Sequence, residues 1–353
     1  MVENRPAVAF TIAYGRHAVA AARLLRATFA AAHPDVPFLL VEDGVYSLFA
    51  RQKAVAHVAE IVSLRTMIGY FLSLHFPRVI YLDADVLVLD RLERLLDWDA
   101  PAEAVFTRDV AAFDYGFGPD VPVLNAGVLA ASSPRFWRTW MTMVYSCVVP
   151  VAGNFFDQFA LRLLARNGAV PTLVLPEEAE RDFYNIGYRD HPGDWAIAGG
   201  PADPHVRKGD ARVRLWHWAG DTSKVSLDML PEPVRRAALA RIEQGKGHTN
   251  YADENRLLRL LFDAHGEPFQ RMIEAEFAAL GTLVMDGITF RNRVAPPGLF
   301  SSEAPAAWDA LRPPLPGLHR RLLARAPRYL YARDPERLLQ PDVEALDVPG
   351  LSG

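Results

Sequence analysis

Two carboxylates interrupt an apolar segment, and their placement constrains the fold more than any other feature of the chain. Segments 79–82 (Val-Ile-Tyr-Leu) and 86–89 (Val-Leu-Val-Leu) have the composition of buried strands, with Asp83-Ala84-Asp85 between them. An unpaired carboxylate inside such a sheet would cost several kcal/mol. We therefore expect Asp83 and Asp85 at a strand end, where α/β sheets bind ligands and where two acids can hold a divalent cation.

Three interpretations of this Asp-x-Asp pair remain open from the stretch alone. The acids could cap the strand and face solvent or arginines. In nucleotide-sugar glycosyltransferases such a pair binds a metal and a diphosphate, whereas in haloacid-dehalogenase-like phosphatases the first Asp is the nucleophile. Those phosphatases place the nucleophile strand first in the core domain. Here the acidic strand comes well inside the chain, which disfavours a phosphatase.

Composition narrows the class further. The 353 residues are 50% hydrophobic, enough for a large core, and the net charge of −4 gives no general attraction for nucleic acid. The single cysteine, Cys147, cannot form an intrachain disulfide, and we interpret it as a small apolar side chain. No signal peptide and no apolar segment long enough to span a membrane are visible. These features predict a cytoplasmic protein.

Alternating apolar strands and amphipathic helices predict an α/β fold with a mostly parallel central sheet. No Gly-x-Gly-x-x-Gly follows the first strand, which argues against a dinucleotide site. Beyond residue 225 the pattern becomes mainly helical. We expect strands at 7–13, 36–41, weakly at 60–63, 79–89, 104–107, 121–130, 173–176 and 213–220, helices at 17–32, 64–75, 91–96, 134–146, 231–244 and 255–279, and a short hairpin near 283–291.

Polar residues within apolar stretches mark further candidate sites. Arg65 could contact phosphate or simply face solvent from a helix. Asn125-Ala126-Gly127 interrupts a strand, which indicates a bulge or the close approach of another group to the backbone. Asp157 could cap a helix or bind a ligand. His217 lies among tryptophans and could be either a core residue or a metal ligand.

Four motifs, in order, resemble those of the family-eight retaining glycosyltransferases. Tyr81-Leu-Asp-Ala-Asp-Val-Leu-Val88 resembles the family's metal motif, and Leu124-Asn-Ala-Gly-Val-Leu129 its second signature. Asp157-Gln158 resembles the third, and His217-Trp-Ala-Gly220 followed by Lys224 the last. Lys224 lies seven residues after His217, one more than is usual in the family, and no Pro-Trp follows it. The similarity covers residues 7–224.

The resemblance implies a GT-A type fold and metal-dependent transfer of a glucose or galactose from a UDP-sugar, with retention at the anomeric carbon. It implies Mn²⁺ or Mg²⁺ held by Asp83, Asp85 and His217. Gln158 would lie opposite the leaving group, and since an amide is a poor nucleophile, a front-face mechanism is expected. The implied donor contacts are Thr11, Ala13 and Tyr14 near the base and ribose, Arg65 and Lys224 near phosphate, Asp109, Asn125, Ala126 and Asp157 near sugar hydroxyls, and Asp83, Ala84 and Gly220 in the motifs themselves.

The carboxyl-terminal third matches no motif, and we place a domain boundary near residue 225, giving 1–225 and 226–353. The acceptor could be a saccharide, a glycolipid or a protein. The arginine-rich stretch 318–331 could contact an anionic membrane, at the inner face of which the enzyme would lie peripherally, or form an ordinary solvated helix. A catalytically silent module that only binds nucleotide-sugars is the non-enzymatic alternative.

Overall fold

A computed structural model of the chain describes residues 6–13, 15–41, 58–98, 101–108, 124–146, 156–168, 170–175, 182–183, 195–218, 225–245, 251–279, 282–285 and 288–291. Several predictions fall outside these ranges. They concern Tyr14, Asp109, Cys147, Gly220, Lys224 and the arginine-rich stretch 318–331. No helix in the described ranges is both long and apolar enough to cross a membrane.

A mixed sheet of six described strands forms the centre of the molecule, in the order β2-β1-β3-β6-β5-β7. β1 is parallel to β2 and to β3, and β5 is parallel to β7. Only β6 is antiparallel to its neighbours β3 and β5. The predicted α/β class with a mostly parallel sheet is thus confirmed. The strands are β1 (Val8–Ile12), β2 (Phe38–Val41), β3 (Val79–Leu82), β5 (Ala104–Arg108), β6 (Leu124–Ala131) and β7 (Thr172–Leu175).

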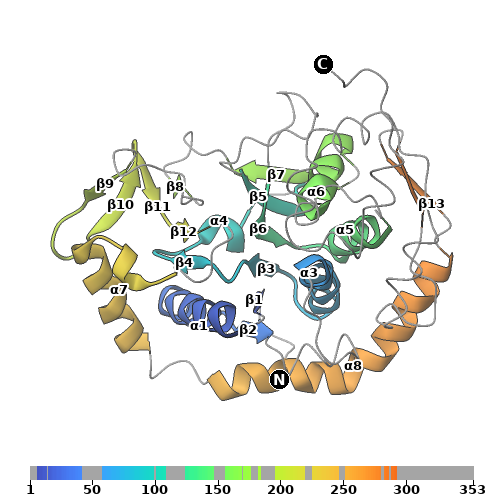
Figure 1. Ribbon diagram of the computed structural model, residues 1–353, viewed down its shortest axis with the longest axis horizontal. Helices are drawn as coiled ribbons and strands as arrows, with labels where there is room; N and C mark the ends of the chain where they lie inside the picture. Colours follow the sequence, from blue (N-terminus) through green and yellow to red (C-terminus); the bar gives the residue numbers. More distant parts are fainter. Residues whose placement is uncertain are drawn as a thin grey trace.

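Helices cover both faces of this sheet (Figure 1). On one face lie α3 (Val58–Ser73), α5 (Pro134–Ser146) and α6 (Phe156–Asn167). On the other lie α1 (Gly15–Ala32) and α4 (Glu93–Leu96), together with the short strand β4 (Val86–Val88). Successive side chains of a strand point to opposite faces. Ile80 and Leu82 therefore pack with Leu25 and Phe29 of α1, while Tyr81 turns toward Arg65 of α3.

A second, smaller sheet extends the fold beside β4. β12 (Leu215–His217) pairs antiparallel with β4, and this pair brings the later part of the chain next to the acidic turn. β8 (Asp182–Phe183), β11 (Ala211–Val213), β10 (His205–Lys208) and β9 (Ala196–Ala198) form a four-stranded sheet in that order. Its residues Val206 and Val213 share an apolar cluster with Leu87 and Trp216.

The predicted helical carboxyl-terminal region is present over its described part. A short 3₁₀ turn, η2 (Leu227–Met229), precedes α7 (Glu232–Gly245) and α8 (Tyr251–Ala279). The predicted hairpin also forms, from β13 (Thr282–Met285) and β14 (Ile288–Arg291). α7 packs against α1, and α8 runs along the β2 side of the molecule (Figure 1).

One predicted strand was wrong. Residues 60–63 belong to α3, which continues without a break from Val58 to Ser73. The apolar character of these residues is shared by strands and by buried helices, so a four-residue window cannot separate the two. The continuous α3 places Arg65 inside a helix that packs on the sheet, rather than near a helix start.

Candidate metal centre

Asp83, Asp85 and His217 converge at the carboxyl end of β3. Asp83 directly follows β3, Asp85 directly precedes β4, and His217 is the last residue of β12. Antiparallel pairing places His217 opposite Val86, and the Trp218 amide donates a hydrogen bond of 2.8 Å to the carbonyl of Asp85. The β4–β12 ladder therefore fixes the histidine beside the acidic turn.

The ligating atoms of these three residues lie within 4.8 Å of one another. His217 Nε2 is 3.2 Å from Asp85 Oδ1 and 4.0 Å from Asp83 Oδ2. His217 and Asp85 are almost fully buried, whereas the side chain of Asp83 is 33% exposed. The cluster is therefore held rigidly on one side and open on the side of Asp83.

Gly127 of β6 makes room for the cluster. The Asp83 amide donates a 2.7 Å hydrogen bond to the Gly127 carbonyl, so the two backbones touch. A Cβ at position 127 would collide with Asp83 Oδ2, lying only 2.7 Å from Asp83 Cγ and 2.9 Å from His217 Cε1. The predicted close approach at Asn-Ala-Gly is confirmed for this glycine.

The donor set fits a divalent cation. Two carboxylates and one imidazole suit Mn²⁺ or Mg²⁺, and Mn²⁺ tolerates the nitrogen better. The absence of a side chain at Gly127 lets the Asp83 carboxylate and the His217 ring lie close enough to share one ion. These three residues, predicted from the sequence, are thus brought together as a candidate metal centre.

Asp83 Oδ1 is held by two donors on the α3 side of the sheet. Tyr81 lies two residues before Asp83, so both side chains share one face, and its hydroxyl donates to Oδ1 at 2.6 Å. Arg65 Nη1 donates to the same oxygen at 3.2 Å. Burial first, and the neighbouring carboxylate second, raise the pKa of Tyr81 well above its usual value of 10, which keeps the phenol protonated as a donor.

One alternative predicted that Arg65 faces solvent, and this was wrong, because Arg65 is only 5% exposed. Its guanidinium donates to the Ala126 carbonyl at 3.2 Å and forms an ion pair with Asp157 of α6. The Arg65 Cζ lies 5.1 Å from the ring centroid of Tyr81 and 5.5 Å from that of Trp140. A buried arginine is tolerated here because carboxylates, a carbonyl and two aromatic faces compensate for its lost hydration.

Asp157 lies in the first turn of α6 and is fully buried. Its side chain pairs with Arg65, and its carbonyl accepts a 3.1 Å hydrogen bond from the Trp140 indole of α5. Gln158, the next residue, is partly exposed. Asp157, Arg65 and Asp83 form a continuous chain of charges from α6 to the metal centre.

The remaining predicted donor contacts lie on the neighbouring strand ends. Thr11 and Ala13 are buried at the end of β1, where Ala13 packs in one apolar cluster with Ala84. Asn125 is buried in β6, and its side-chain oxygen accepts a 2.7 Å hydrogen bond from the Gly127 amide. Asn125 thereby stabilises the bend of β6 that presents Gly127 to Asp83.

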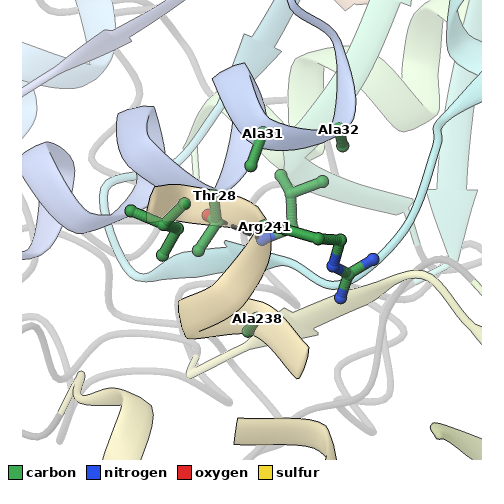
Figure 2. Close-up of a pocket in the computed structure, with 7 residues that line it drawn as sticks. Thr28, Ala31, Ala32, Ala238 and Arg241 are labelled. Atoms are coloured by element: carbon green, nitrogen blue, oxygen red, sulfur yellow. Dashed lines mark hydrogen bonds between the residues drawn. The ribbon is translucent and has the colours of Figure 1, made fainter. Parts of the chain in front are cut away.

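A small cavity elsewhere shares no residue with this cluster. It lies between α1, α7 and β4, and Figure 2 shows Thr28 and Ala31 on α1 and Ala238 and Arg241 on α7 around it. Partial burial of the guanidinium lowers the pKa of Arg241 from its usual value. Alanine side chains form much of its lining, and we interpret it as a packing gap at the α1–α7 contact.

Two contacts were not predicted from the sequence. One is the hydrogen bond from Tyr81 to Asp83, and the other is the ion pair between Arg65 and Asp157. The period of two along β3 could have identified Tyr81, since residues 81 and 83 point to the same side. No sequence signal links Asp157 to Arg65, because that contact depends on how α6 packs against α3.

No family model matches the sequence, and no curated protein matches it. Among solved structures, the galactosyltransferase LgtC, in complex with donor and acceptor sugar analogues, aligns with 68% of this chain and 95% of its own, at 17% identity and a TM-score of 0.41. A glycosyltransferase involved in glycosylation of the major capsid of PBCV-1 aligns with 68% of this chain and 99% of its own, at 14% identity and a TM-score of 0.42. The bifunctional glycosyltransferase WbbM aligns with 68% of this chain but only 50% of its own, at 13% identity and a TM-score of 0.40.

Proposed function

We propose that this chain is a metal-dependent glycosyltransferase of the GT-A type, which transfers glucose or galactose from a UDP-sugar with retention of anomeric configuration. The observation that carries the proposal is the convergence of Asp83, Asp85 and His217 at the carboxyl end of β3, next to Gly127. Ligands of α/β sheets bind at such strand ends. The four ordered sequence motifs support the same function.

The proposal assigns each group a role. Asp83, Asp85 and His217 hold Mn²⁺ or Mg²⁺, which when bound neutralises the charge that develops on the leaving diphosphate. Thr11, Ala13 and Tyr14 meet the base and ribose at the end of β1. Asn125, Ala126, Asp109 and Asp157 orient the sugar hydroxyls, with Ala84 and Gly220 lining the site and Lys224 meeting phosphate. Arg65 contributes positive charge beside Asp83.

Gln158 is proposed to lie near the reacting carbon. Its side-chain amide is neutral and a weak nucleophile, so it would orient the donor rather than form a covalent bond to the sugar. A front-face mechanism, in which the acceptor attacks from the side of the leaving group, accounts for retention. NMR of the product tests this, since an inverted anomeric centre would contradict the retaining mechanism.

A donor screen tests the proposal. UDP release is measured with UDP-glucose and UDP-galactose, with Mn²⁺ or EDTA, for the wild type and Asp85→Asn. We expect turnover only with metal, and a loss of about 10²-fold or more in the variant, because a ligand of the ion is changed. Asp228→Asn is the matched control, since Asp228 is exposed and pairs with Arg235 away from the cluster. Equal turnover of Asp85→Asn and wild type would contradict the proposal.

The silent nucleotide-sugar-binding module is tested by the same screen. It predicts metal-dependent binding of UDP without UDP release for every common donor, even when cell-derived acceptors are added. An Asp-x-Asp phosphatase would instead release inorganic phosphate from phosphomonoesters. Its nucleophile would be Asp83, whose Oδ1 is occupied here by Tyr81 and Arg65.

The acceptor and the cellular location belong to the same proposal. We place the enzyme in the cytoplasm, with residues 318–331 as a peripheral contact to an anionic membrane that would carry a lipid-linked acceptor. Co-sedimentation with anionic vesicles tests the contact. Binding should fall with added salt and when Arg320, Arg321, Arg325 and Arg328 are replaced by glutamine; salt-insensitive binding would exclude an electrostatic contact.

A further inference from the structure

We infer that Tyr81, Arg65 and Asp157 form a positioning relay that selects which oxygen of Asp83 binds the metal. This inference rests on the proposed function, because it concerns the same metal centre. The relay starts from an asymmetry at Asp83. Oδ1 receives the Tyr81 hydroxyl at 2.6 Å and Arg65 Nη1 at 3.2 Å. Oδ2 lies 4.0 Å from His217 Nε2 and packs against Gly127, where a Cβ would collide with it.

Two donors on one oxygen fix the rotation of a carboxylate. An exposed aspartate turns freely about its last torsion, so its two oxygens would exchange at a metal. With Oδ1 held from the α3 side, Oδ2 alone is presented toward Asp85 and His217. Asp83 would then hold the cation through Oδ2 alone.

The second half of the relay keeps Arg65 compatible with a cation site. A lone guanidinium next to Asp83 would repel a divalent ion and compete with it for the carboxylate. Asp157 offsets this charge through its ion pair with Arg65, and the Ala126 carbonyl fixes the guanidinium from a third direction. The rings of Tyr81 and Trp140 pack around it. Arg65 can therefore donate a hydrogen bond to Oδ1 while most of its charge is balanced on α6.

The relay is tested by Mn²⁺ binding to the full chain, with free Mn²⁺ measured by EPR and no nucleotide present. Tyr81→Phe removes only the hydroxyl and should weaken Mn²⁺ binding about 10- to 100-fold, as is usual for groups that orient a metal ligand. Asp157→Asn should also weaken it, because Arg65 then carries an unbalanced charge. Tyr70→Phe is the matched control, since Tyr70 is a buried tyrosine of α3 whose ring packs on Phe269; its Mn²⁺ affinity should equal that of the wild type.

A positioning role differs from a structural one in its readout. Melting temperatures in EDTA should match between Tyr81→Phe and wild type, and UDP release by Tyr81→Phe should recover at saturating Mn²⁺. Asp83→Asn distinguishes failure of the relay from failure of the proposed metal centre. If Asp83→Asn abolishes Mn²⁺ binding while Tyr81→Phe and Asp157→Asn both bind as wild type, the relay is wrong and the proposed metal centre stands. If all three bind Mn²⁺ as wild type does, both the relay and the proposed metal centre are wrong.

Discussion

At the scale of single residues, the site depends on Gly127, which has no side chain, and on His217, which β12 holds in place, as much as on its two aspartates. Asp83 and Asp85 would be ordinary strand-end acids without His217, which β12 delivers beside Val86. The absence of a side chain at Gly127 matters equally, because Asp83 and His217 leave no room for a methyl group there. The aspartates supply negative charge, and the backbone of β6 and β12 places Gly127 and His217 so that this charge can bind a cation.

Gly127→Ala should therefore impair metal binding. The added Cβ would collide with the Asp83 carboxylate, which must rotate or shift. We expect Mn²⁺ affinity to fall at least about tenfold, as when the orientation of a ligand is lost. Gly200→Ala is the matched control, since a Cβ at Gly200 meets nothing within 4 Å. Mn²⁺ titration of both variants checks this, and equal affinities would show that metal binding does not depend on the close packing of Asp83 against Gly127.

At the scale of elements, buried polar contacts lock helices to the segments beside the sheet. His33, at the end of α1, accepts a 2.9 Å hydrogen bond at Nε2 from the Leu92 amide, which lies directly before α4. Thr28 of α1 accepts a 3.1 Å hydrogen bond from the Val88 amide of β4. Two turns of α1 thus fix the chain on either side of residue 90, which keeps β4 in place beside the acidic turn.

The His33 contact predicts a pH-dependent stability. Burial, helped by the nearby Arg91, lowers the pKa of His33 from 6.5 to about 4. The unfolded chain therefore binds a proton between pH 6.5 and 4 that the folded chain does not, and stability falls as pH drops through this window. Such a difference corresponds to at most about 3 kcal/mol.

Urea unfolding at pH 7 and pH 5 measures this effect. His33→Gln keeps an acceptor for the Leu92 amide but cannot titrate, so it should lose less stability between the two pH values than the wild type does. His17→Gln is the control, because His17 is exposed at the other end of α1. If His33→Gln and wild type lost equal stability on acidification, His33 would not be the titrating group.

At the scale of the whole molecule, the described helices after residue 225 are packed onto the part of the chain that carries the central sheet. Val234 and Ala238 of α7 join the apolar cluster that contains Leu87 and Trp216. Phe269 of α8 contacts Tyr70 and Phe71 of α3 with ring centroids 5.6 and 5.1 Å apart. The domain boundary near residue 225 stays a prediction. These contacts lead us to expect that the helices stabilise the sheet rather than fold apart from it.

Phe269→Ala tests this coupling. Phe269 is 6% exposed, and removing its ring leaves a cavity against α3; such substitutions cost about 3 to 5 kcal/mol. We expect a single unfolding transition at lower urea, with hydrogen exchange faster in α3 as well as in α8. Leu260→Ala is the control, since Leu260 of α8 is 54% exposed and should change stability little. Faster exchange in α8 alone would show that α8 opens independently of the sheet.

Three features could be predicted from the residues alone: the α/β class, the position of Asp83 and Asp85 at a strand end, and the helical character of residues 232–245 and 251–279. Each of these depends on short-range information. An apolar run broken by Asp-x-Asp places its acids at a strand end whatever the rest of the chain does, because a buried unpaired charge is too costly. The small residues 125–127 likewise indicated close approach of another group, and Gly127 does meet Asp83 and His217.

Which partners these residues meet depends on tertiary packing. Residues 60–63 have the composition of a strand but lie in α3, since burial in a helix and in a sheet select similar apolar residues. The antiparallel direction of β6 follows from the path of the whole chain. Arg65 is buried because Asp83, Ala126 and Asp157 arrive from three different elements to compensate its charge. Whether a charged side chain is exposed or buried depends on the partners that packing supplies, and a local sequence pattern does not contain that information.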